Sequence, residues 1–95
     1  MSATASPILM TRESLQTAIR HAAAHRSVGN KVWISDVARE LCVSMAELAF
    51  FLGMARRLGW VAMSRCDLPY LFPGHPVEAS EIQEGFVTWH FMHVD

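Results

Sequence analysis

The sequence has few charged residues, few cysteines and no long uninterrupted apolar run. Only 18% of its 95 residues are charged while 52% are hydrophobic, a balance that excludes an intrinsically disordered chain. No run approaches the roughly 18 apolar residues that a membrane-spanning helix needs, so we expect no membrane partner. At this length the sequence predicts one small domain with a single hydrophobic core.

The two cysteines, Cys42 and Cys66, are far apart and follow no metal-ligand spacing. A disulfide between them stays an alternative, but we expect reduced thiols and a cytoplasmic protein. Residues 1–10 contain no basic side chain, so we expect no secretory signal there. They predict instead a flexible lead-in to a domain that spans residues 11–95.

The sequence also lacks motifs typical of catalytic, phosphate-binding or metal-binding sites. No glycine-rich phosphate loop follows a predicted strand, and no paired acidic site is evident. His21 and His25 lie four residues apart on a predicted helix, but two nitrogen ligands are too few for structural zinc. Surface histidines are therefore the preferred interpretation, with metal binding as the alternative. We expect neither an enzyme nor a cofactor or small-molecule substrate.

The first half of the chain predicts a helix followed by a short strand. Thr11 is an expected N-cap, and apolar residues recur at three- and four-residue spacing from Leu15 to Ala23. Gly29 and Asn30 should end this helix. Lys31–Ile34 then predicts a strand.

Two more helices follow in close succession. Ser35 should cap the second, and Ser44 should cap the third, because Ser44 and Glu47 have the spacing of a capping box. The third helix should run to about Leu58 and end at Gly59.

Two strands are expected behind the helices, Trp60–Arg65 and Phe86–Val94, paired with each other or with the first strand. The segment between them, Cys66–Gly85, predicts an extended wing with one helical turn at Ser80–Gln83. Within it, we expect Leu68–Pro76 to fold back onto the domain or a second subunit. The expected core contains Leu15, Ile19, Ile34, Val37, Ala38, Leu41, Val43, Leu48, Phe51, Leu52, Leu58, Val61, Trp89 and Phe91.

This order of elements over residues 11–95 resembles the winged helix-turn-helix superfamily. The resemblance rests on the second-helix start Ile34–Ala38 and on four positions of the third helix, Leu48, Leu52, Ala55 and Gly59. It implies an α+β fold in which three helices pack on a small antiparallel sheet with an extended wing. The same scaffold serves transcription regulators, replication proteins and purely protein-binding modules.

The resemblance favours a small bacterial or phage-type regulator that binds DNA as a dimer, with its third helix in the major groove. Its expected DNA contacts are Lys31, Ser44, Arg56, Arg57 and Arg65. Against this, residues 61–95 carry one basic and five acidic side chains, a balance that DNA repels.

The third helix supports an alternative, a module that binds protein rather than DNA. Base readout calls for basic or polar side chains, yet this helix presents small and apolar ones. The expected interface residues are Ala46, Ala49, Phe50, Gly53 and Met54, and the partner would be a second copy or another protein. The simpler alternative for Phe50 is a place in the core, beneath the first helix or the wing.

Overall fold

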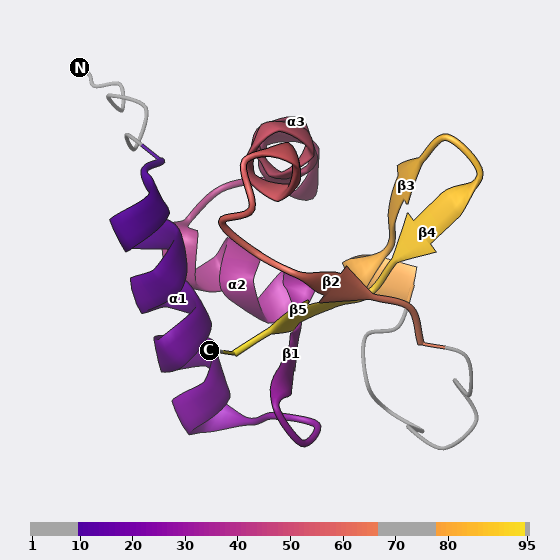
Figure 1. Ribbon diagram of the computed structural model, residues 1–95. Coiled ribbons are helices and arrows are strands. Elements are labelled where there is room, and N and C mark those ends of the chain that lie inside the picture. The colour runs from indigo at the N-terminus through magenta and orange to yellow at the C-terminus, as the bar shows by residue number, and fades with distance from the viewer. Residues whose placement is uncertain (1–9, 67–77, 95) are drawn as a thin grey trace.

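A computed structural model describes residues 10–66 and 78–94 and has an α+β fold, as expected (Figure 1). Three helices pack on a small antiparallel sheet, and a separate β-hairpin projects beside the third helix. In chain order the elements are α1 (Arg12–His25), β1 (Lys31–Trp33), α2 (Ile34–Leu41), α3 (Met45–Arg57), β2 (Met63–Ser64), the 3-10 helix η2 (Glu78–Ser80), β3 (Ile82–Glu84), β4 (Val87–Trp89) and β5 (Phe91–His93).

The main sheet has three strands in the order β1-β5-β2, all antiparallel neighbours. Lys31 pairs with His93, and Met63 pairs with Met92, so the last strand lies between two strands from earlier in the chain. Figure 1 shows this sheet below α3 and to the right of α1, with β5 leading to the C-terminus.

The predicted strand Phe86–Val94 is in fact two strands. It breaks at His90, whose backbone amide donates to the Ser64 carbonyl at 2.9 Å. The second part, β5, pairs with β1 and β2 as predicted. The first part, β4, instead pairs with β3, so the prediction that the whole segment pairs with Trp60–Arg65 or Lys31–Ile34 is wrong for this half.

The helical turn predicted at Ser80–Gln83 is also wrong. A 3-10 helix comes earlier, and β3 begins at Ile82, whose side chain is buried. The hairpin loop between β3 and β4 has two residues, and Gly85 takes the first position with a φ of 62°. The predicted fold-back of Leu68–Pro76 lies outside the described residues.

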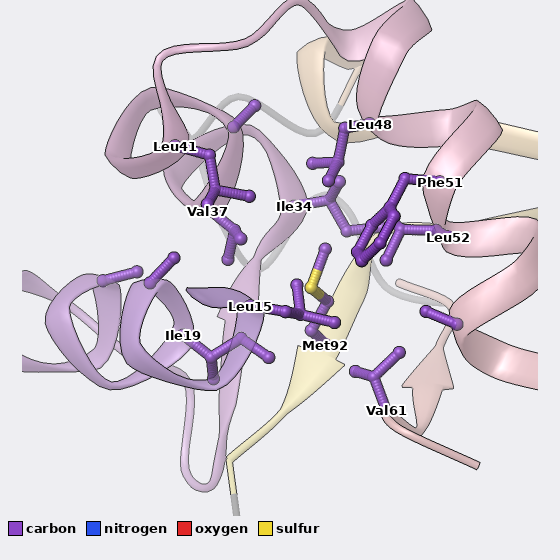
Figure 2. Close-up of a cluster of buried hydrophobic side chains, with 14 of the residues drawn as sticks. Leu15, Ile19, Ile34, Val37, Leu41, Leu48, Phe51, Leu52, Val61 and Met92 are labelled. Carbon is purple, nitrogen blue, oxygen red and sulfur yellow. The ribbon is translucent and has the colours of Figure 1, made fainter. Parts of the chain in front are cut away.

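The main core is formed where the three helices meet the sheet (Figure 2). Its labelled side chains are Leu15, Ile19, Ile34, Val37, Leu41, Leu48, Phe51, Leu52, Val61 and Met92. Both faces of β5 are covered, because Met92 enters this core while Phe91 joins a second cluster with Trp33 and Cys66. The Trp33 and Phe91 ring centroids are 4.5 Å apart. Met10, which we expected in the flexible lead-in, is half-buried and packs against the main core.

Leu58 was expected in the core, but 57% of it is exposed. The chain reverses after α3 in a Schellman motif, in which the amide of Trp60 donates to the Ala55 carbonyl at 2.9 Å. Gly59 has the positive φ that this reversal requires, 75°. Trp60 therefore packs inward against Phe51, with ring centroids 6.0 Å apart, and Leu58 is left outside. Two further residues expected in the core are only half-buried, Val43 and Trp89.

Two of the three predicted N-caps are confirmed. Thr11 and Ser44 each accept a hydrogen bond from a backbone amide of their own first turn. The Ser35 cap is wrong, because α2 begins at Ile34, two residues earlier than a Ser35 cap implies. Its N-cap residue, Trp33, provides no side-chain hydrogen bond. Instead, the Ser35 amide donates to the Ser80 hydroxyl oxygen at 3.2 Å. A side chain from a distant part of the sequence thus accepts a hydrogen bond from one of the free amides at the start of α2.

A partly buried ion pair joins the end of α1 to the first turn of α2. The Arg26 guanidinium donates to both carboxylate oxygens of Asp36, at 2.7 and 2.9 Å. This bidentate contact raises the pKa of Arg26 through its hydrogen bonds to the carboxylate. It links the two helices α1 and α2, which pack directly against each other.

Candidate functional site

Helix α3 has an apolar outer row in addition to its buried inner stripe. The inner residues Leu48, Phe51, Leu52 and Ala55 are buried. On the outside, apolar residues recur every four positions along one line of the helix surface, at Ala46, Phe50, Met54 and Leu58. We call these four residues the outer row.

The outer row is open to solvent. Phe50 is 89% exposed, Leu58 57% and Met54 40%. The alternative that placed Phe50 in the core is therefore wrong. Exposed large apolar side chains that gather on one face of a small protein are a recurring feature of interaction sites.

The two smallest predicted interface residues do not belong to this open surface. Ala49 is half-buried and packs against the core. Gly53 is turned toward the β3–β4 hairpin, because a Cβ there would lie 3.6 Å from the Glu84 Oε2 atom. Of the five residues predicted for a protein interface, Ala46, Phe50 and Met54 form the exposed set.

The hairpin is held against the side of α3 by Arg56. Its guanidinium forms an ion pair with Glu84 on β3 and lies 5.6 Å from the centroid of the Trp89 ring on β4. Figure 1 shows the hairpin rising beside α3. Its end carries two more exposed apolar side chains, Phe86, which is fully exposed, and Val87.

Several of the predicted DNA contacts already have partners within the protein, among them Arg56, Ser44 and Lys31. The Arg56 charge is paired with Glu84. The Ser44 amide and hydroxyl both bond to Glu47 in the capping box, at 3.0 and 3.1 Å. The Lys31 ammonium lies 5.8 Å from the centroid of the Phe91 ring.

Arg57 and Arg65 are both exposed, and Arg65 also has an interaction partner within the protein. The five residues do not form one cluster, because Ser44 and Arg57 stand at opposite ends of α3, about 20 Å apart at the rise of an α-helix. A duplex-binding surface gathers its basic side chains on one face. The five predicted DNA contacts are not gathered on one face in this way.

A charge of each sign flanks the outer row. Glu47 lies in the first turn of α3, where hydrogen bonds from Ser44 lower its pKa and keep it ionised. Arg57 is the last residue of the helix. Both are exposed, and none of the ion pairs found among residues 10–66 and 78–94 uses either of them.

Other kinds of site were sought over the same described ranges. No group of three metal-ligating side chains lies close enough there to hold a metal ion. The His21 Nδ1 atom lies 3.7 Å from a carboxylate oxygen of Glu40, which makes an ion pair when the imidazole is protonated. No helix in the described part of the chain is long and apolar enough to cross a membrane.

Comparisons with family models, with curated proteins and with solved structures find no match to this chain. The functional assignment therefore rests on the geometry of α3 and the hairpin. Three residues of that surface were not predicted, namely Leu58, Phe86 and Val87. Leu58 could have been found as the fourth member of the i, i+4 row, and Phe86 as the loop residue after Gly85 in a two-residue hairpin.

Proposed function

We propose that this protein is a protein-interaction module built on a winged-helix scaffold, and that it docks a protein partner through the outer row of α3. The observation that carries the proposal is the exposure of Phe50 in a row with Met54 and Leu58. Such a row supplies a large aromatic anchor, which protein interfaces favour, with smaller apolar neighbours around it.

The winged-helix part of the proposal is supported by the order of the elements. A strand precedes the closely spaced helices α2 and α3, and the sheet order β1-β5-β2 brings the last strand between the first two. The β3–β4 hairpin lies in the connection between β2 and β5, which is the place of a wing. In this scaffold α3 is the helix that presents its outer face to a partner.

A DNA-binding regulator, which the superfamily resemblance implies, receives less support. In the major groove the outer face of α3 would present Phe50 and Met54 to the bases, where hydrogen-bonding side chains are needed. The hairpin would bring Glu84 toward phosphates, although Arg56 partly neutralises this carboxylate.

Site-specific photo-crosslinking in the native host tests the proposal. A photoreactive phenylalanine analogue replaces Phe50 on the outer row or, as the matched control, Arg12, which is exposed on α1. We expect light-dependent protein adducts heavier than the 10.6 kDa chain from position 50 only. Equal adducts from both positions, or none from position 50, would contradict protein docking on this face.

A gel-shift experiment with random-sequence duplex tests the DNA alternative. Phosphate contacts are strongest at low ionic strength, so about 50 mM salt is the most permissive condition. We expect no shifted complex. A complex that is lost in an Arg57→Glu variant would overturn the proposal in favour of DNA binding.

A further inference from the structure

We infer that the partner docked on the outer row is a second copy of this chain, with the two α3 helices packed antiparallel about a two-fold axis. This inference rests on the proposed function and names its partner. It comes from the pattern of sizes and charges along the outer row, which is complementary to itself in only one orientation.

The apolar residues match in size when the row is reversed onto itself. A two-fold axis perpendicular to α3 near position 52 brings Phe50 opposite Met54 of the second copy, and Ala46 opposite its Leu58. Each contact occurs twice, as a symmetric interface requires. A large side chain thus faces a smaller or flexible one at every position, and thioether side chains adapt well to an aromatic neighbour.

The flanking charges select the same orientation. The axis that pairs Phe50 with Met54 also brings Glu47 opposite Arg57 of the second copy, at both ends of the helix pair. A parallel arrangement would instead place Glu47 against Glu47 and Arg57 against Arg57. Like charges at matched positions are unfavourable, so charge complementarity favours the antiparallel pair.

The remaining faces of α3 leave this surface accessible. The hairpin occupies the side of the helix that carries Gly53 and Arg56. The outer row, Glu47 and Arg57 stay exposed, and the Arg57 guanidinium lies near Gly53, at the border between the hairpin and the outer row. The row extends over about 20 Å of helix, which makes a small interface by the standard of stable dimers. We therefore expect dissociation in the range of about 10–100 µM.

Sedimentation equilibrium of charge-reversed variants tests the register. Glu47→Arg alone and Arg57→Glu alone each turn both attractive pairs into repulsive ones, so we expect each to weaken self-association by about tenfold or more. An equimolar mixture of the two variants restores both pairs in a heterodimer. We expect the mixture to associate within about threefold of the unaltered protein.

Three further measurements support this test. Glu47 is part of the capping box, so circular dichroism confirms that the Glu47→Arg variant is folded. The Phe50→Glu variant, which leaves the capping box intact, provides a second disruption of the row. As the matched control, Arg12→Glu reverses an exposed charge on α1 and should leave the association constant unchanged.

The possible results separate this inference from the proposed function. A monomer at about 500 µM, single variants that associate normally, or a mixture that fails to associate would each overturn the antiparallel dimer. Crosslinking from position 50 then shows whether any protein docks on the outer row. Adducts only at masses other than twice that of the chain would leave the docking face standing with a different partner. No adducts at all would remove both proposals.

Discussion

The two faces of helix α3 are both apolar, but they have opposite surroundings. Leu52, on the inner face, is covered by the other helices and the sheet, whereas Leu58, on the outer row, is mostly exposed. The difference lies in what covers each face, because the side chains are alike. A hydrophobic stripe therefore shows that a surface can be buried, while only the packed structure shows whether the protein's own chain covers it.

The inner face should dominate stability. Leu52→Ala removes a fully buried side chain and leaves a cavity, so we expect a loss of about 2–5 kcal/mol in the free energy of unfolding. Leu58→Ala is the matched control, the same chemical change on the outer row, and should cost less than about 1 kcal/mol. Urea denaturation at a fixed protein concentration measures both. Equal losses would show that Leu58 is buried and would end the distinction between the faces.

The outer row should dominate association. Phe50→Glu places a charge at the centre of the exposed row, so we expect self-association to weaken by about tenfold or more. Because the side chain has little contact with its own domain, unfolding of the dilute monomer should change by less than about 0.5 kcal/mol. Sedimentation and urea denaturation separate the two effects. A strongly destabilised monomer would mean that Phe50 supports the fold.

The side of α3 that meets the hairpin should show a smaller, local effect. Arg56→Ala removes the ion pair with Glu84 and the contact with the Trp89 ring. Because Arg56 is partly exposed, we expect a loss of only about 0.5–1 kcal/mol. Hydrogen exchange should quicken at the β3 and β4 amides while the α1 amides stay protected. Arg57→Ala is the control. Equal exchange rates at the β3 and β4 amides in the two variants would show that Arg56 does not stabilise the hairpin.

The smallest expected effect concerns the start of α3. Hydrogen bonds from Ser44 lower the pKa of Glu47 in the folded protein, so its contribution to stability is present above the unfolded pKa. That contribution is lost as pH falls through the lowered, folded-state pKa. As pH falls from about 6 to 3, the thermal unfolding temperature of the unaltered protein should therefore fall slightly more steeply than that of Glu47→Gln. This variant keeps the capping acceptor without the charge. Identical pH profiles would contradict this contribution.

Features that depend on neighbours along the chain were predictable. The Thr11 and Ser44 caps, the end of α3 at Gly59 and the strand at Lys31 all follow from short-range hydrogen bonding and backbone preference. The inner stripe of α3 followed from its period. Part of the candidate site was found by the same means, since Ala46, Phe50 and Met54 stand where polar side chains were expected.

Features that depend on distant partners were not predictable in the same way. The Ser35 cap failed because the amides at the start of α2 bond to distant groups. Ser80 takes one and the His90 carbonyl takes another. The strand prediction over Phe86–Val94 failed because its two halves join different sheets, which an alternating pattern does not distinguish.

The sequence by itself determined three helices, the N-caps of α1 and α3, the end of α3, and the apolar character of both faces of α3. Hydrogen bonds within one turn and helical periodicity carry that information. Only the tertiary structure decided that Phe50 and Leu58 stay outside while Trp60 and Met92 pack inward. The physical reason is that burial depends on which surfaces meet, and those surfaces come from segments tens of residues apart.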